Sequence, residues 1–393
     1  MQAVELDQES GLKRLYGRVA KQIGALVVPE VNLNELAQAV REFEKSYTMR
    51  SRVPSDGQRR RIPEILSRGS TKHLHALADG AFSVADRRHR YMLELKRLLK
   101  AREIVPAKYL YWTELGSRRW LEICERDSYR FFRDSSDLLR EKAHEIVACV
   151  IGATGTAELD LISLGSGDGS KDHLLLDSII KSLSDDQRVY YYPIDISDSM
   201  IVQAVRTAVG SCVEKDKVSL KAIVADFTQM RELQKVFEER PNPNVFSILG
   251  NTIGNNDELA VIEALVDGMF PGDILLVEIN VGKSGNVDGF VQDEVTMRAD
   301  FVPLEVIGVQ FEASMMEHHI VSDLSIVPNT ETTVTQYRKA TIDGVEVADI
   351  KLSLVHHYDL DQFRKVIERR LHVDTLLVEQ RNEVALLVAQ RRP

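Results

Sequence analysis

The glycine-rich turn at residues 165–169 is the segment of this sequence whose chemistry is easiest to interpret. An apolar run, residues 159–164, leads into Gly165, Gly167 and Gly169, and a helical pattern follows from Lys171. A strand, a tight glycine turn and a helix start bring backbone close to a nucleotide. The spacing is G-x-G-x-G rather than the dinucleotide pattern G-x-G-x-x-G, which suits a ligand without a pyrophosphate whose amino-acid tail lies over the turn.

Three predicted strands downstream also end in polar residues. Asp195 ends the run that begins at Val189, Asp226-Phe227 follow residues 218–224, and Gly250 to Asn255 follow residues 245–249. A carboxylate at the tip of the second strand accepts hydrogen bonds from ribose hydroxyls, and an acid beside an aromatic ring suits adenine. The carboxyl ends of strands in open α/β sheets form the ligand-binding edge. The pattern therefore predicts S-adenosyl-L-methionine rather than NAD.

Composition restricts the class of protein. The chain has 393 residues, 44% of them hydrophobic and 28% charged, which predicts an ordinary soluble protein of more than one domain. A net charge of −10 argues against a nucleic-acid partner, since proteins that bind nucleic acids usually present a basic surface. Three cysteines without metal-ligand spacing predict reduced thiols and a cytoplasmic location. Apolar runs are too short to span a bilayer, so no membrane partner is predicted.

The order of patterns predicts an α/β fold: a doubly wound, mainly parallel Rossmann-like sheet with an antiparallel edge. Residues 1–105 are expected to form an N-terminal helical domain. Residues 106–284 and 351–393 are expected to form the Rossmann-like domain, and residues 285–350 a β-rich inserted lobe that binds substrate. The helix expected at 359–370 and the strands after it favour the antiparallel extension.

The N-terminal domain carries a basic amphipathic helix, predicted at 86–102, with Met92, Leu95, Leu98 and Leu99 on one stripe. Its basic face indicates either an RNA or protein partner or a solvated surface of a helix packed on the core. The acidic net charge favours the second interpretation. The N-terminal helices are also candidates for a homodimer interface, although a lid or simple packing predicts the same apolar stripes.

Four motifs together resemble the ergothioneine-pathway histidine Nα-methyltransferase family, which is S-adenosylmethionine-dependent. They are Leu164 to Gly167 with Lys171, Pro193 to Ser197, Ala225 to Phe227, and Leu249 to Asn255. The segment from Trp112 to Ser117, continuing to Arg133, is similar to that family's amino-terminal motif. The resemblance covers roughly residues 107–393 and implies the class I methyltransferase fold.

The resemblance also implies roles for individual residues. Asn255 is expected to reach the amino-acid group of the substrate. The expected cofactor residues are Gly165, Ser166, Gly167, Lys171, Asp195, Ile196, Asp226, Phe227 and Asn251.

The substrate half of the motif pattern departs from the family. Trp112 stands where the family has a tyrosine, and Phe290 stands where it has a second tyrosine. Ser353 and Val355 stand where the family has the Glu-x-Ser pair that binds the imidazole of histidine. Tyr129 begins an aromatic segment whose sequence differs from the corresponding motif of the family. We expect Asn255, Trp112, Tyr129, Phe290 and Ser353 to contact substrate. An imidazole would lack its polar partners, so an amino-acid-derived amine or guanidine, arginine-like rather than histidine, is the predicted acceptor.

Methyl transfer to nitrogen needs alignment in a dry pocket, and a protonated amine must first lose its proton. Glu278, at the end of a predicted parallel strand, is the expected catalytic carboxylate, whereas Glu312 and Glu317 are expected to be surface acids. The adjacent histidine pairs at 318–319 and 356–357 lie on predicted strands, where neighbours point to opposite faces, so no metal site is predicted.

Two other functions remain open at this stage. One is an RNA or protein methyltransferase that holds its substrate with the basic N-terminal helices. The other is a cofactor-binding scaffold without catalysis.

Overall fold

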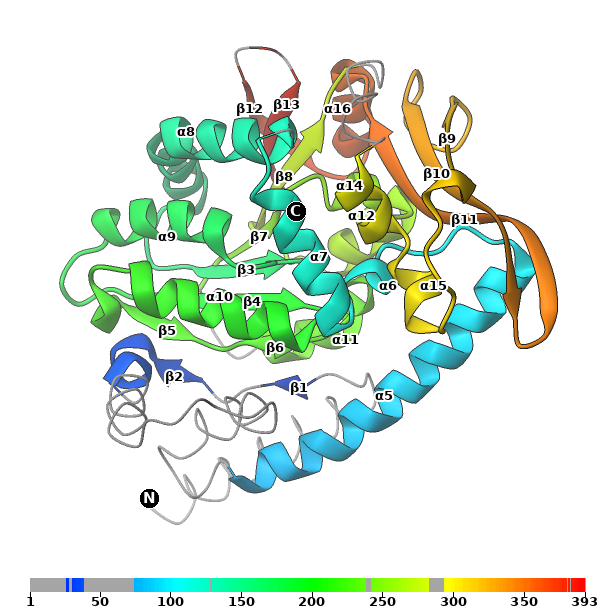
Figure 1. Ribbon diagram of the computed structural model, residues 1–393. Helices are drawn as coiled ribbons and strands as arrows, with labels where there is room; N and C mark the ends of the chain where they lie inside the picture. Colours follow the sequence, from blue (N-terminus) through cyan, green and yellow to red (C-terminus); the bar gives the residue numbers. More distant parts are fainter. Residues whose placement is uncertain are drawn as a thin grey trace.

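The computed structural model describes residues 26–27, 30–38, 74–127, 129–237, 242–282, 293–379, 381 and 383–392. Ten of the described strands form one mixed sheet, with helices on both faces (Figure 1). The sheet order is β1-β6-β4-β3-β7-β8-β13-β12, with β5 beside β4 and β2 beside β5. The doubly wound α/β fold with an antiparallel edge is therefore confirmed.

The parallel centre of the sheet follows from long apolar runs, which strands buried on both faces require. Strand β3 pairs in parallel with β4 on one side and with β7 on the other, so the strand order reverses at β3. Ligands bind beyond the carboxyl ends at such a reversal. The central strands are β3 (Asp160–Leu164), β4 (Val189–Asp195), β5 (Val218–Leu220), β6 (Ile223–Val224), β7 (Asn244–Ile248) and β8 (Ile274–Asn280).

The antiparallel strands lie at both edges. Strand β13 (Val384–Gln390) lies between β8 and β12 (His372–Val378) and is antiparallel to both. At the other edge, β1 (Leu26–Val27) and β2 (Val31–Asn32) pair with β6 and β5. The expectation that the N-terminal region is helical is wrong for these two segments, because their residues complete the sheet edge. The Asn34 N–H donates to Asn32 Oδ1 at 2.9 Å, which caps the helical residues 33–38 that follow β2.

Two apolar cores cover the two faces of the main sheet. On one face, α8, α9 and α10 pack against alternate residues of the strands; on the other face, α11, α12 and α16 do so. The helices are α8 (Arg130–Thr154), α9 (Ser170–Ser182), α10 (Asp198–Ser211), α11 (Met230–Phe237), α12 (Glu258–Gly268) and α16 (Leu360–Glu368). Short 3-10 turns η1 (Lys215–Lys217), η2 (Phe227–Gln229) and η3 (Ile253–Asn255) connect some of these elements.

A second, three-stranded antiparallel sheet forms the predicted β-rich lobe at one end of the main sheet (Figure 1). Its strands are β9 (Met316–Val321), β10 (Glu331–Ile342) and β11 (Val345–His357), preceded by α14 (Glu294–Asp300), α15 (Val302–Val306) and η5 (Ala313–Met315). Strand β11 continues past residue 350, the boundary predicted for the lobe, and ends next to β8, where Val281 bridges to Tyr358.

A third core joins the lobe to the long helix α5 (Leu74–Ala101) and to α6 (Lys108–Tyr111). Helix α7 (Glu114–Cys124) follows α6 in the chain. Leu95, Leu98 and Leu99 are buried in the third core. The basic side chains of α5 have acidic partners: Lys96 and Lys100 bind Asp343 at 2.7 and 2.8 Å. The interpretation of this helix as packed on the core is therefore confirmed, while the homodimer prediction rests largely on residues outside the described ranges.

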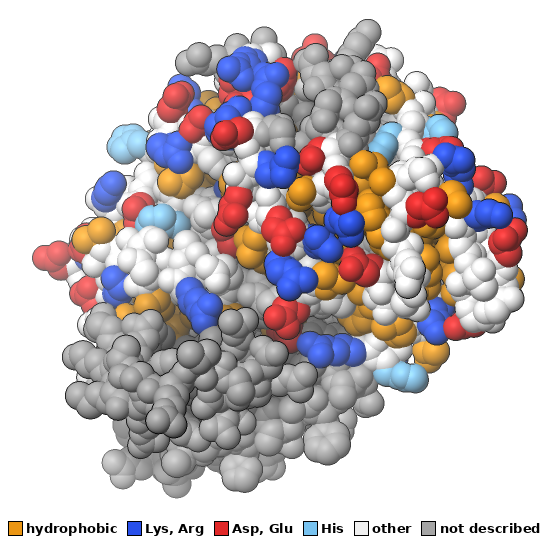
Figure 2. All heavy atoms as spheres, viewed as in Figure 1, with side chains coloured by type: hydrophobic (Ala, Val, Ile, Leu, Met, Phe, Trp, Pro, Cys, Tyr) orange, Lys and Arg blue, Asp and Glu red, His pale blue; other side chains and the backbone are white. Residues whose placement is uncertain are grey.

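On the face shown in Figure 2, basic and acidic side chains are interspersed over the described surface. None of the described helices is long and apolar enough to cross a bilayer.

We expect Leu99→Ala to lower the free energy of unfolding by about 2–5 kcal/mol, because it opens a cavity where α5 meets the lobe. Leu93→Ala, on the same helix but 57% exposed, is the matched control and should change it by less than about 0.5 kcal/mol. Urea unfolding of the two variants measures the difference. Equal effects would contradict the packing of α5 on this core.

Candidate functional site

Two cavities lie at the carboxyl edge of the main sheet. The first, of about 320 Å³, is lined by the turns that follow β3, β4, β6 and β7. The second, of about 350 Å³, lies between α7, the start of α8 and the lobe. Tyr111, Trp120 and Asn255 line both cavities, so the two spaces meet at these side chains.

The glycine turn forms one wall of the first cavity. Gly165, Gly167 and Gly169 have φ of 69°, 56° and 74°, a left-handed conformation that glycine adopts without strain. A Cβ on Gly165 would lie 3.1 Å from Thr252 Cγ2, so the turn also needs a residue without a side chain. The buried Ser166 Oγ lines the cavity and has no hydrogen-bond partner among the described residues, which fits a polar ligand group there.

Asp195 is the buried carboxylate of the first cavity, 7% exposed. Its Oδ2 accepts from the Gly167 N–H at 3.0 Å and its Oδ1 from the Ser197 N–H at 2.9 Å. Burial raises its pKa to about 6, and these backbone hydrogen bonds oppose the rise. A carboxylate has about four acceptor positions, so these backbone contacts leave acceptor capacity for a ribose hydroxyl.

Asp226 and Phe227 line the opposite part of the same cavity. Asp226 Oδ1 accepts from the Thr228 N–H at 3.0 Å and from the Thr228 hydroxyl at 2.6 Å, which fixes the carboxylate. Asp226 Oδ2 lies 3.2 Å from Lys108 Nζ, so α6 is tied to the end of β6 by a partly buried ion pair.

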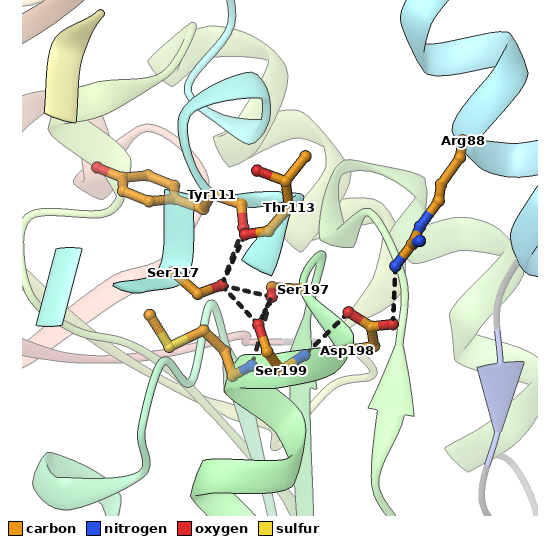
Figure 3. Close-up of polar contacts among 8 residues, drawn as sticks. Arg88, Tyr111, Thr113, Ser117, Ser197, Asp198 and Ser199 are labelled. Carbon is orange, nitrogen blue, oxygen red and sulfur yellow. Dashed lines mark hydrogen bonds and ion pairs between the residues drawn. The ribbon is translucent and has the colours of Figure 1, made fainter. Parts of the chain in front are cut away.

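A cluster of three serine hydroxyls joins the segment that carries Tyr111 to the loop that carries Asp195 (Figure 3). Ser117 Oγ lies 2.6 Å from Ser197 Oγ and receives a hydrogen bond from Ser199 Oγ at 2.8 Å. Ser117 Oγ is also 3.2 Å from the Tyr111 carbonyl, while the Tyr111 side chain points away from the cluster. On the far side, Arg88 of α5 pairs with Asp198 at 3.4 Å.

Glu278 is where the sequence predicts it, at the end of β8, but it lines neither cavity. It is fully buried, its Oε2 lies 3.0 Å from Lys171 Nζ, and the Gly250 N–H donates to the same oxygen. The role of proton acceptor stays a prediction, and the contacts of Oε2 pair this side of the carboxylate with a lysine and a backbone turn. Lys171 itself lines the first cavity.

Asn251, predicted to contact the cofactor, lines the second cavity rather than the first. Its φ is 56°, and its Oδ1 accepts from the Asn280 N–H at 3.0 Å. A Cβ on Gly254 would lie only 2.4 Å from that oxygen, so the glycine lets the asparagine lie against the backbone. The segment Gly250 to Asn255 thus fixes the end of β8 through the hydrogen bond between Asn251 and Asn280.

Trp112, predicted to contact substrate, lines neither cavity. It is 5% exposed and packs edge-on against Tyr91 and Tyr109 at centroid distances of 5.5 and 6.2 Å. Its neighbour Tyr111 occupies the cavity wall in its place, because successive residues of a helical turn point in different directions. Tyr129 and Ser353 do line the second cavity, and Phe290 lies outside the described residues.

Sequence reasoning missed several residues of the second cavity. Trp120 was recognised only as part of a motif, and Tyr111 was one position from the predicted contact. Asp300 ends the short helix α14 in a region expected to be β-rich. His357 also lines the cavity, and burial lowers its pKa to about 4, so its imidazole is neutral at pH 7. Adjacent His356 points elsewhere and lies 3.1 Å from Glu258, as expected for neighbours on a strand.

Every other predicted cofactor residue lines the first cavity, and Asn255 lines both cavities. A doubly wound sheet with such a cavity at its carboxyl edge defines a nucleotide-binding α/β protein. Residues 93–287 match the family model described as histidine-specific methyltransferase, SAM-dependent. The chain belongs to this family over that segment, about half of its length, and is an S-adenosylmethionine-dependent methyltransferase. The predicted family, enzyme class and cofactor are confirmed.

Solved structures show weaker likeness. An S-adenosylmethionine-dependent methyltransferase from Clostridium acetobutylicum is 10% identical, with 66% of this chain and 92% of that chain covered and a TM-score of 0.33. The glycopeptide N-methyltransferase MtfA complexed with S-adenosyl-L-methionine is 13% identical, with 65% and 87% covered and a TM-score of 0.36. Magnesium protoporphyrin IX methyltransferase from Synechocystis is 13% identical, with 72% and 96% covered and a TM-score of 0.36. A search among curated protein sequences finds no match to the chain.

We expect Asp195→Asn to weaken S-adenosylhomocysteine binding by roughly tenfold to hundredfold, because hydrogen bonds to a charged acceptor contribute about 1.5–3 kcal/mol. In the unmodified protein, affinity should fall as the pH falls through about 6, where Asp195 gains a proton, and this pH dependence should flatten in the variant. Isothermal titration calorimetry between pH 5 and 8 measures both effects. Asp198→Asn, which alters an acid outside both cavities, is the control, and an equal loss in that variant would refute the assignment.

Proposed function

We propose that the protein is an N-methyltransferase whose acceptor is a small amino acid or an amino-acid-derived amine or guanidine. The observation that carries this proposal is the meeting of the two cavities at Tyr111, Trp120 and Asn255. A cofactor in the first cavity and an acceptor in the second would bring their reacting atoms together at that junction. Such alignment is the main contribution a protein makes to this reaction.

The size and polarity of the second cavity support a small polar acceptor. Its volume, about 350 Å³, falls in the range typical of small-molecule sites. Thr296 Oγ1, Thr333 Oγ1 and His357 Nε2 line it and, within the described part of the chain, are buried without hydrogen-bond partners. Buried polar atoms normally have partners, so these three favour a ligand that supplies them.

In this proposal the first cavity holds the cofactor through the residues named from the sequence. Asp195 receives the ribose hydroxyls, Asp226 and Phe227 contact the adenine, and the turn at residues 165–167 contacts the amino-acid tail. Ile196 packs against the bound nucleoside, and Lys171 supports this wall through Glu278. When bound, S-adenosylmethionine supplies a methyl group on a positively charged sulfur. The chain's own residues orient the acceptor nitrogen and exclude water.

The second cavity favours an arginine-like acceptor over histidine. Ser353 and Val355 line it at the positions where the family has the carboxylate and hydroxyl that hold an imidazole. Neither side chain supplies the missing acid, so histidine would lose a charged partner.

The basic helix gives little support to an RNA or protein substrate. Besides the Asp343 contacts of Lys96 and Lys100, Arg97 pairs with Glu103 at 2.8 Å, so much of the positive face of α5 is already neutralised. Phosphate binding relies on unpaired basic side chains. A scaffold without catalysis would have no use for a second cavity that opens at the cofactor site.

We expect labelled S-adenosylmethionine to methylate one or more free amino acids or amines, arginine before histidine, and to leave bulk tRNA and denatured protein unlabelled. Counting acid-soluble against acid-precipitable label separates the two classes of product. Label confined to the polymer would overturn the proposal, and tight cofactor binding with no labelled product in a metabolite extract would favour the scaffold.

We expect Tyr111→Ala to lower kcat/KM for the best acceptor by at least about tenfold, because it removes a wall shared by both cavities. Trp112→Phe should lower the melting temperature and leave kcat/KM within about twofold, because Trp112 is a core residue outside both cavities. Steady-state kinetics and thermal melts of the pair distinguish the two positions. If Trp112→Phe lowered kcat/KM strongly and Tyr111→Ala did not, Trp112 rather than Tyr111 would be the substrate contact.

A further inference from the structure

Asp300 is the one carboxylate of the second cavity without a basic partner among the described residues. The other acid in the cavity wall, Glu383, lies 3.2 Å from Arg130. Asp300 Oδ2 instead accepts from the Thr335 hydroxyl at 3.0 Å, and within the described ranges no Lys, Arg or His nitrogen lies within ion-pair distance of it. Arg130 and Arg381 also line the cavity, but they pair with Glu383 at 3.2 Å and with Asp134 at 3.6 Å. Among the described residues, Asp300 is therefore left without a cation paired to it.

Two elements hold this carboxylate in place. It ends α14, and the Thr335 hydroxyl binds it from β10, while Ser353 of β11 lines the same cavity. Tyr111, which lines both cavities, is affected by its charge: burial, and next the charge of Asp300, raises the pKa of that phenol. Asp300 is thus held in the wall of the second cavity, of which Tyr111 is also a part.

The surroundings of Asp300 leave its charge uncompensated. The His357 imidazole in the same cavity is neutral at pH 7, so it supplies no positive charge. Burial raises the pKa of Asp300 to about 6, and the Ser353 and Thr335 hydroxyls oppose the rise, so the group is mostly ionised at neutral pH. Asp300 is partly buried, and a partly buried charge without a partner is costly, so a cationic ligand that reaches it removes that cost.

We propose that Asp300 binds the positively charged group of the acceptor and makes the second cavity selective for a guanidinium or ammonium compound over a neutral one of the same shape. This inference rests on the proposed function, since it assigns the acceptor to the second cavity. Thr333 and Thr296 then contribute neutral hydrogen bonds to the same ligand. Charge-assisted hydrogen bonds are about twice as strong as neutral ones, so Asp300 would dominate the choice.

The test compares arginine with citrulline, which has nearly the same shape but carries a neutral ureido group in place of the guanidinium. Binding of each is measured by calorimetry with S-adenosylhomocysteine present, for the unmodified protein and for Asp300→Asn. We expect the unmodified protein to bind arginine at least about tenfold more tightly than citrulline, and the variant to lose most of that difference.

Asp323→Asn is the matched control, because it makes the same change at an exposed acid of the lobe outside both cavities. It should retain the preference for arginine. Unchanged S-adenosylhomocysteine affinity in Asp300→Asn shows that this variant is folded with its cofactor site intact.

Failure of this inference is distinguishable from failure of the proposed function. Equal binding of arginine and citrulline, no binding of arginine, or an undiminished preference in Asp300→Asn would overturn the role of Asp300. The proposed function stands in each of these cases if the acceptor screen shows methylation of any free amine or guanidine, and it fails separately if the screen shows none.

Discussion

The ion pair between Lys171 and Glu278 is the interaction on which the geometry of both cavities depends. It joins the first turn of α9 to the end of β8 at a distance of 3.0 Å, and Glu278 also receives the Gly250 N–H from the turn after β7. Removing one member of a buried pair leaves an uncompensated charge and typically costs about 3–5 kcal/mol. The rings of Phe131 and Phe132 lie 5.5 and 5.2 Å from the ammonium and shield it from water. One contact thus fixes the strand ends that both cavities share.

Two further contacts hold the helical segment α6–α7 against this edge. The Lys108–Asp226 pair fixes α6 to the end of β6, and the serine cluster fixes the start of α7 to the loop after β4 (Figure 3). Tyr111 lies between these two attachments and forms part of the wall of both cavities. The acceptor cavity is therefore built partly on groups that border the cofactor cavity.

The sequence was sufficient for the features that depend on local pattern. A strand end, a glycine turn and the polar residue that follows are neighbours in the chain, so Asp195, Asp226 and the turn at 165–169 could be placed on one edge. The contacts that the sequence did not reveal depend on partners far away. Glu278 meets a lysine 107 positions earlier, and the rotation of one short helical turn decides between Tyr111 and Trp112. Asp300 could not be identified from the sequence, because its proposed role depends on the lack of a paired cation among described residues that come together from distant parts of the chain.

The first cavity, proposed for the cofactor, and the second cavity, proposed for the acceptor, are therefore constrained differently. The first uses backbone N–H groups and carboxylates whose positions follow from the ends of the strands, so few substitutions leave it intact. The second uses side chains from α7, α14, β10 and β11, and the last three of these elements pack on the lobe core. Side chains such as Ser353 and Asp300 can change there without disturbing Asp195 or the glycine turn. Under the proposed function, substrate choice is then an electrostatic property of the lobe, whereas methyl-donor binding is a property of the sheet edge.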